Sequence, residues 1–471
     1  MSAKSLGKES LIYGVGHIIT RSIAFLLMPI YTNAFSLEDY GILSLIYTFL
    51  GFMNVILHYG LDASLLKHYV PADQEDKKSI LTNTYASFMV TTIVFIIIMI
   101  LLRNHVSELL FGVNLLKITL LVLGILFFDV LWAIHLLLLR AENKPILFTG
   151  INLFNALSSL GFSIFFIIYL KLGIYGALLS NIITSGCIFL ITLPLILKRI
   201  SISTLSINQW KKLMNFAYPF FFSGIFSMIM ELSDRYILLK LTNIKTVGLY
   251  NAGYKLGMIM MLVVVGFNMA WQPFFLRKDP EEKDYIVKTT TIVISILGFL
   301  WILLLLWSEN LVKVQLWNYT FIGEQFWAST QIVPIIALAY IFHALYLLQL
   351  PGVYLLVKSG WIAWVRGVGA VLNITLNFLL IPTYGIVGAA VATCISYLLI
   401  AVLFYIINQK IFNISYNWKK LGIIALSTGV IFIIQINFHL DMPMKIILSI
   451  FYPVVIVISG VFKLNYLRVF N

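Results

Sequence analysis

Charged residues and cysteines are scarce in this chain of 471 residues. Charged residues make up 11% of it, whereas hydrophobic residues make up 61%. A soluble domain needs more charge on its surface than this, so the composition excludes a soluble globular fold. The two cysteines, Cys187 and Cys394, have no spacing that suggests a disulfide framework or a metal site. We therefore expect no metal, no cofactor and, without paired carboxylates or a nucleophile with its base, no enzyme.

Long apolar runs, by contrast, fill almost the whole sequence. Each is about 20 residues long, which is the length that crosses the hydrocarbon core of a membrane as a helix. The pattern predicts an all-α integral membrane protein with about fourteen transmembrane helices. The expected helices lie approximately at 10–35, 40–62, 80–102, 116–139, 147–170, 173–197, 213–240, 247–272, 286–308, 328–349, 362–381, 386–408, 420–438 and 445–462.

The positive charges are distributed unequally between the two sides of the predicted membrane. Of the 32 Lys and Arg residues, 22 fall on the side that holds the N-terminus and seven on the opposite side. Because cytoplasmic segments carry the excess of Lys and Arg, we expect both termini in the cytoplasm. The net charge of +13 then needs no nucleic-acid partner. It is explained by this bias, with attraction to anionic membrane lipids.

Two pairs of similar segments indicate an internal repeat. LGIYGALLSNIITS at 172–185 matches YGIVGAAVATCISY at 384–397, and DYGILSL at 39–45 matches TVGLYNA at 246–252. The offsets, 212 and 207 positions, are nearly constant and predict two pseudo-symmetric copies of one helical bundle. Two such lobes around a central site are typical of transporters. The expected parts are a six-helix lobe at 1–197, a cytoplasmic linker at 198–212, a second six-helix lobe at 213–409 and a C-terminal helix pair at 410–471.

Several predicted helices carry polar side chains within the membrane. An ionisable side chain at the bilayer centre costs about 2.5–3.5 kcal/mol, so it normally faces protein or a water-filled cavity. In the seventh helix, Glu231 and Arg235 lie four residues apart on one stripe, with Asp234 beside them. The other candidates are His17 and Arg21 in the first helix, Asn54, His58 and Asp62 in the second, Asp129 in the fourth, Asn152 and Asn155 in the fifth, Lys255 in the eighth, and Asn373 and Asn377 in the eleventh.

These side chains predict a wet, partly cationic cavity between the two lobes. Its positive charge would come from Arg21, Arg235 and Lys255. The planar fork of arginine holds two phosphate oxygens at once, and amides suit sugar hydroxyls, so the cavity favours a phosphorylated glycan. Structural alternatives stay open at this point. Arg235 can pair with Glu231 or Asp234, and Lys255 can extend its amine to the membrane surface.

Two acidic residues are candidates for binding a coupling ion. Asp62 and Asp129 lie within predicted helices, where a carboxylate can take up H+ or Na+. The histidines His17 and His58 fit hydrogen-bonded packing groups better than proton carriers. The sequence therefore leaves H+ and Na+ as alternative coupling ions.

Three segments resemble a known family of membrane proteins. They are SLIYGVGHIITRSIAFLLMPIYTNAFSLEDYGILSLIYTF at 10–49, ELSDRYILLKLTNIKTVGLYNAGYKLG at 231–257 and LNITLNFLLIPTYGIVGAAVATCISY at 372–397. They are similar to bacterial polysaccharide flippases, the Wzx-type members of the multidrug/oligosaccharidyl-lipid/polysaccharide exporter superfamily. Since the segments lie at the start, middle and later part of the chain, the resemblance covers nearly its full length.

The resemblance implies transport of a lipid-linked glycan in the bacterial inner membrane. Such proteins move an undecaprenyl-pyrophosphate-linked oligosaccharide repeat unit to the outer leaflet by alternating access, coupled to an ion gradient. Arg21 and Arg235 match family positions where positive charge is expected, and Lys255 is a weaker third. The implied partners are membrane lipids, a polysaccharide polymerase and chain-length proteins. The cargo stays open between O-antigen, capsule, exopolysaccharide, a teichoic-type polymer and lipid II.

Two other functions compete with this hypothesis. A drug or metabolite antiporter on the same fold would need acidic residues that bind organic cations, whereas the deep charge here leans positive. A polymerase or ligase acting on the same lipid carrier would need a sizeable extramembrane loop. The longest outer loop, about 309–327, contains one acidic residue, Glu324, besides Glu309 at its edge.

Overall fold

Helices make up almost all of the computed structural model. It describes residues 16, 19, 20, 22, 23, 25–102, 116–276, 279, 281–316, 319–356 and 360–461. The predicted all-α membrane class is confirmed. In this part of the chain, one antiparallel hairpin pairs β1 (Gln315–Leu316) with β2 (Tyr319–Thr320). The chain folds into two compact units, Met1–Gly248 and Leu249–Asn471.

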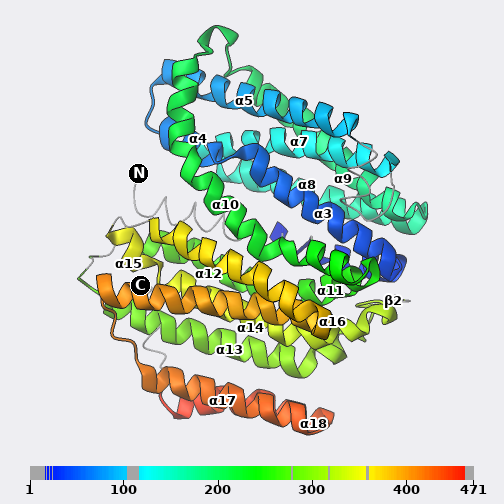
Figure 1. The fold of residues 1–471 in the computed structure, drawn as a ribbon, viewed down its shortest axis with the longest axis vertical. Coiled ribbons are helices and arrows are strands. Elements are labelled where there is room, and N and C mark those ends of the chain that lie inside the picture. The colour runs from blue at the N-terminus through cyan, green and yellow to red at the C-terminus, as the bar shows by residue number, and fades with distance from the viewer. Residues whose placement is uncertain are drawn as a thin grey trace. The chain divides into compact units, whose positions relative to one another are not determined.

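The first unit is a bundle in which α7 packs against α5 and α9, as Figure 1 shows. Helix α10 packs there against α3, α4 and α5. Because α10 begins at residue 207, the last residues of the predicted linker are helical. The predicted division into lobes at 197 and 213 stays a prediction. The elements of this unit are α2 (Leu27–Ala34), α3 (Leu37–His58), α4 (Leu61–Tyr69), α5 (Gln74–Leu101), α7 (Leu116–Ala141), α8 (Pro145–Ser163), the π-helix η1 (Ile164–Tyr169), α9 (Gly173–Leu197), the 3₁₀ helix η2 (Ile202–Thr204), α10 (Ile207–Leu241) and the start of α11 (Ile244–Gly257).

The second unit is built around α14, which packs against α12, α13 and α16. The C-terminal helices α17 and α18 lie side by side against α13 (Figure 1). The elements of this unit, after the end of α11, are α12 (Ile259–Phe275), α13 (Asp284–Val312), the two strands, the 3₁₀ helix η3 (Glu324–Ile332), α14 (Val333–Leu348), α15 (Leu350–Leu355), α16 (Gly360–Ile411), α17 (Trp418–Asn437) and α18 (Met442–Ile458).

The helices have the length and hydropathy of membrane spans. Among the described residues, ten helices are long and apolar enough to cross a membrane, and the number is eleven if the bent pair Ile244–Gly257 and Ile259–Gln272 counts as one span. Helix α16, of 52 residues, joins the spans predicted at 362–381 and 386–408 across a kink at Gly385. Helix α18 is shorter, with 17 residues. The span predicted at 10–35 lies mostly outside the described residues.

Polar caps begin several of these helices. Ser36 and Asp39 form a capping box at the start of α3. The Asp73 side chain accepts a hydrogen bond from the backbone N–H of Asp76 at the start of α5. The first four N–H groups of a helix have no backbone partners within it. Capping side chains accept hydrogen bonds from these groups and so fix the residue at which the helix begins.

The second predicted helix is shorter than its apolar run. We predicted 40–62, but α3 ends at His58, where Tyr59 (φ 31°) and Gly60 (φ 80°) adopt left-handed conformations. The stretch between this predicted helix and the next, 63–79, contains most of α4 and the start of α5. A side chain at Gly60 would overlap the carbonyl of Ala217 on α10, so the break follows from a close helix contact.

The two predicted glycine steps adopt the same local structure. Gly173 (φ 58°) and Gly385 (φ 52°) are both left-handed. Three residues later, a Cβ on Gly388 would lie 2.4 Å from the Leu380 carbonyl oxygen, and one on Gly176 would lie 3.0 Å from the Phe166 carbonyl oxygen. Glycine is required at these positions for conformation and for close approach, because it has no Cβ.

The C-terminal helix pair is held to α13 by specific contacts. Tyr452 donates to the Ser295 carbonyl at 3.0 Å, and Lys445 Nζ donates to Asn310 Oδ1 at 2.7 Å. Gly298 lies beneath the Tyr452 ring, since a Cβ there would be 2.5 Å from the phenol oxygen. These contacts keep α18 against α13.

Candidate functional site

Arg235 forms a buried ion pair on α10. Its Nη1 donates to Asp234 Oδ1 at 2.7 Å and also to the Glu231 carbonyl. Asp234 is 1% exposed and Arg235 3% exposed. The sequence left Glu231 and Asp234 as alternative partners of Arg235. The structure places the Asp234 carboxylate against the guanidinium. Each charge compensates the other, because neither is stable alone at this burial.

Three predicted polar residues of the first unit come together where α3 meets α4 and α7. His58 Nδ1 lies 3.3 Å from Asp62 Oδ2, and His58 Nε2 lies 3.3 Å from the Val130 carbonyl. Asp129, next to Val130, accepts hydrogen bonds from Ser185 Oγ at 2.6 Å and from Trp132 Nε1 at 3.0 Å. Asp62 is half exposed and lies in α4, after the break, not in the same helix as His58.

The other predicted residues lie in separate places. Asn152 donates to the Phe148 carbonyl of its own helix at 2.8 Å. In the second unit, Asn373 and Asn377 are fully buried in α16, and Asn377 Nδ2 lies 3.1 Å from Asn373 Oδ1. Lys255 lies in the last turn of α11 and is half-buried.

Four predicted residues are half-buried or lie outside the described part of the chain. Asn54 on α3 and Asn155 on α8 are half-buried. His17 and Arg21 lie outside the described residues. That these side chains line one cationic cavity stays a prediction. Among the described residues, no group of three or more His, Cys, Asp or Glu is placed to hold a metal ion.

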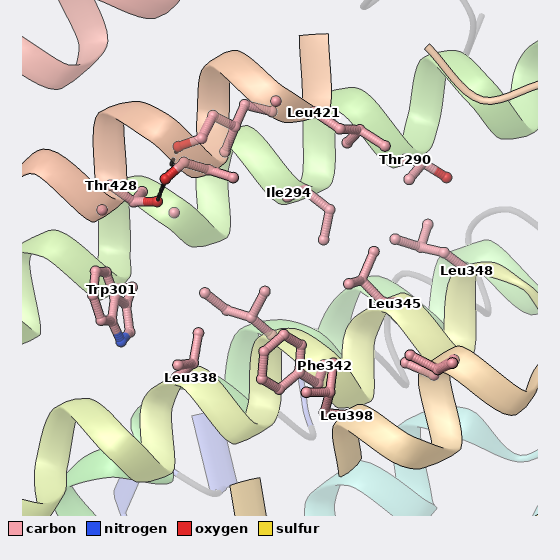
Figure 2. A pocket seen from close by; sticks show the side chains of 18 of the residues that line it. Thr290, Ile294, Trp301, Leu338, Phe342, Leu345, Leu348, Leu398, Leu421 and Thr428 are labelled. Carbon is pink, nitrogen blue, oxygen red and sulfur yellow. Dashed lines mark hydrogen bonds between the residues drawn. The ribbon is translucent and has the colours of Figure 1, made fainter. Parts of the chain in front are cut away.

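A groove of about 730 Å³ opens in the second unit among α13, α14, α16 and α17. Figure 2 shows Leu338, Phe342 and Leu345 on α14 facing Ile294 on α13 across it. The Trp301 indole donates to the Pro334 carbonyl at 2.8 Å, so its polar atom is satisfied within the wall. We call this the apolar groove. Its lining includes Ile294, Gly298, Trp301, Leu338, Phe342, Leu345, Leu398, Ala401, Leu421, Gly422, Thr428 and Gly429.

Sequence reasoning missed the partners of Asp129 and the apolar groove. Ser185 and Trp132 carry no signal of their own, although Trp132 stands three residues after Asp129 on one helix face. The groove is invisible in the sequence because its lining resembles any lipid-facing helix surface. It is defined only by the spacing of four helices.

Comparison with known proteins adds to this geometry. The model of the family described as polysaccharide biosynthesis protein matches residues 6–278, more than half of the chain. The chain belongs to the polysaccharide biosynthesis protein family. The predicted family resemblance is thereby confirmed.

A relative of this chain comes from Haemophilus influenzae. It is described as an uncharacterized membrane protein and is 21% identical over 278 residues. The match covers 58% of this chain and 66% of the relative, slightly less than two thirds of its length.

Solved structures share the fold across most of the chain. The lipid II flippase MurJ in an inward closed conformation matches with a TM-score of 0.78 at 16% identity, covering 95% of this chain and 98% of its own. An inward-facing multidrug resistance MATE family transporter of the MOP superfamily matches with a TM-score of 0.69 at 12% identity, covering 83% and 94%. At these identities the likeness shows the fold, which is that of multi-pass membrane transporters and flippases.

Proposed function

We propose that this protein moves an undecaprenyl-pyrophosphate-linked oligosaccharide repeat unit from the cytoplasmic to the outer leaflet of the bacterial inner membrane. One observation carries the proposal: a member of the polysaccharide biosynthesis protein family has the fold of a lipid II flippase. Transport by alternating access and cytoplasmic termini belong to the same proposal. A polysaccharide polymerase and chain-length proteins would act on the delivered glycan.

The apolar groove supports a lipid-linked cargo. A polyprenyl chain is wholly apolar and has no hydrogen bond to make, and the groove offers it aliphatic and aromatic side chains (Figure 2). Burial of the chain there would be favourable in proportion to the apolar contact it makes in place of bilayer lipid. We propose that the groove holds part of the carrier lipid during transport.

The Asp129 carboxylate supports coupling to an ion gradient. It lies within a membrane-spanning helix, where it accepts hydrogen bonds from Ser185 and Trp132. A carboxylate in such a place can bind H+ or Na+. We therefore propose Asp129 as the coupling residue, with transport of Asp129→Asn expected to be independent of the gradient.

The first test is deletion of the gene in its native host, with a membrane-impermeant probe of the leaflet that holds the lipid-linked glycan. We expect single repeat units on the cytoplasmic leaflet and loss of surface polymer. Single units that reach the outer leaflet without polymerising would contradict the proposal and indicate a later step.

The role of Arg235 is testable with matched variants. Arg235→Ala leaves Asp234 buried without its cation, which costs about 3–5 kcal/mol, so lost transport would reflect misfolding. The double variant Asp234→Asn with Arg235→Gln removes both charges. If the cation contacts the substrate, the double variant is present in the membrane but inactive, whereas Arg235→Lys keeps part of the activity. Normal transport by the double variant would make the pair purely structural.

A drug antiporter is the second candidate, favoured by the fold of a multidrug transporter and by the Asp129 carboxylate. Expression of the chain in a drug-sensitive host separates the two functions. Raised resistance to several cationic drugs, lost in Asp129→Asn, would support the antiporter. Unchanged resistance, with restored polymer in the deletion strain, would support the flippase.

A further inference from the structure

A second pocket, of about 580 Å³, lies in the first unit where four spans end. Helix α5 begins there at Gln74, α7 ends at Ala141, α8 begins at Pro145 and α9 ends at Leu197. Because these are the ends of membrane-spanning helices, the pocket lies at the level of lipid headgroups. We call it the basic pocket. It is lined by Tyr69, Gln74, Lys77, Lys78, Ala141, Glu142, Asn143, Lys144, Lys198 and Arg199.

One carboxylate organises part of the basic pocket. Glu142 accepts two hydrogen bonds from Arg199, at 2.7 and 3.0 Å, and one from Lys144 at 2.6 Å. Tyr69 donates a fourth at 3.2 Å. Arg199 also donates to the Leu195 carbonyl at the end of α9. Arg199 and Lys144 are therefore held by the protein itself.

The charge of Glu142 is fixed at neutral pH. Its burial acts to raise the pKa, but hydrogen bonds and charges from Lys144 and Arg199 outweigh burial and lower the pKa. Burial raises the pKa of Tyr69 to about 12, so the phenol keeps its proton and remains a donor. Glu142 thus compensates one positive charge in the pocket and no more.

Three lysines in the pocket have no such compensation. Among the described residues, no carboxylate lies within the 4.0 Å ion-pair distance of Lys77, Lys78 or Lys198. Lys77 Nζ lies 5.6 Å from the centre of the Tyr69 ring. Acidic residues of the α5 start, Asp73 and Glu75 among them, are exposed and do not line the pocket.

We propose that the basic pocket binds the phosphate group of an anionic membrane lipid. Amines of three uncompensated lysines converge on one pocket from two segments, and lysine binds phosphate as a point charge. Basic pockets between membrane helices suit phospholipid headgroups, and the excess of Lys and Arg predicts that this end faces the anionic cytoplasmic leaflet. Gln74 and Asn143 offer hydrogen bonds to the headgroup oxygens. This site goes beyond the proposed transport.

Lipid binding by the full-length protein in detergent tests the assignment. The probes are phosphatidylglycerol and, as the zwitterionic reference, phosphatidylcholine, with bound lipid counted by native mass spectrometry. We expect the wild type to prefer phosphatidylglycerol. The triple variant Lys77→Gln, Lys78→Gln, Lys198→Gln should lose about 100-fold in affinity for it, from about fivefold for each lysine.

The matched control is the double variant Lys211→Gln, Lys212→Gln. These adjacent lysines are exposed near the start of α10, whereas near the start of α5 Lys78 is exposed and Lys77 half-buried. Lys211 and Lys212 do not line the pocket. We expect the control to bind phosphatidylglycerol as the wild type does. An equal loss in both variants would show general surface attraction and would overturn the proposal, as would wild-type binding by the triple variant.

Two further arms keep the test decisive. If the triple variant is not recovered from membranes, Lys78→Glu at an exposed position replaces it. This variant changes the charge by two, so the expected loss is about 25-fold, with the same criteria. Inorganic pyrophosphate is the soluble probe. Saturable binding of pyrophosphate, with no preference between the two lipids, would assign the pocket to a soluble phosphate and overturn the lipid assignment. No transport substrate is present, so failure here leaves the proposed transport intact.

Discussion

The basic pocket of the first unit and the apolar groove of the second differ in the side chains that line them. The basic pocket has five cationic side chains and one carboxylate, collected from helix ends. The apolar groove has mostly aliphatic and aromatic side chains, collected along α13, α14, α16 and α17. Charged groups therefore line the pocket at the helix ends, and apolar groups line the groove along the spans.

This difference follows from the solvent at each depth. At the surface, lysine amines remain hydrated and attract phosphate. In the hydrocarbon, helix surfaces gain nothing from apolar character alone, so a groove there selects its occupant by shape and packing. A protein that handles amphipathic lipids can use both kinds of site. The following variants alter one pocket and leave the other unchanged.

The largest effect is expected from Gly298→Leu, which overpacks one wall of the apolar groove. The new side chain would collide with Tyr452, whose ring packs over Gly298, and would push α18 away from α13. Overpacking of this kind costs about 1–3 kcal/mol. Thermal unfolding in detergent measures it. Gly422→Leu on α17, where nothing lies within 4 Å of an added Cβ, is the control. Equal destabilisation by both would contradict the proposed contact.

An intermediate effect is expected from Gly429→Phe, which fills the apolar groove without a clash. Gly429 lines the groove, and nothing lies within 4 Å of its added Cβ. If the groove holds the carrier lipid, we expect roughly tenfold slower transport, equal to about 1.4 kcal/mol, with unchanged thermal stability. Leu426→Phe, exposed on the same helix outside the groove, should transport normally. Equal loss in both would argue against a lipid in the groove.

The smallest effect is expected from Glu142→Gln in the basic pocket. The folded-state pKa of Glu142 is lowered, so its ion pairs stabilise the protein above the unfolded-state pKa, and this stability is lost as the pH falls through the folded-state pKa. The unfolding temperature of the wild type should therefore fall more steeply than that of Glu142→Gln below about pH 4.5. The difference should stay below about 1 kcal/mol, because the pairs are partly exposed. Glu75→Gln, exposed on α5, should follow the wild type.

The hydropathy pattern predicted most helices within a few residues. The run at 286–308 became α13, and the run at 173–197 became α9 with the predicted bounds. Lipid forces every backbone N–H and C=O to bond within its own segment, so an apolar run of this length must be a helix. The helix break at Gly60 was missed because a single glycine in an apolar run does not by itself predict the end of a helix. Glycine is required at this position by the close approach of α10.

The site was predicted as a set of residues but not as a set of contacts. Sequence spacing put both Glu231 and Asp234 within reach of Arg235, and rotamers and packing decided for Asp234. His58 and Asp62 were expected to meet along one helix. They lie 3.3 Å apart across a helix break instead. Spacing along a helix limits which pairs are possible, but side-chain direction and neighbouring helices select among them.

The sequence by itself determined the membrane class, the positions of most spans and the family, because hydropathy and glycine steps act over short stretches of chain. Only the tertiary structure decided where Lys77, Lys144 and Lys198 gather and how four helices leave the apolar groove open. The sequence alone shows these lysines only as part of the excess of positive charge in the predicted cytoplasmic segments. Their meeting in one pocket depends on contacts between helix ends far apart in the chain, which no local pattern encodes.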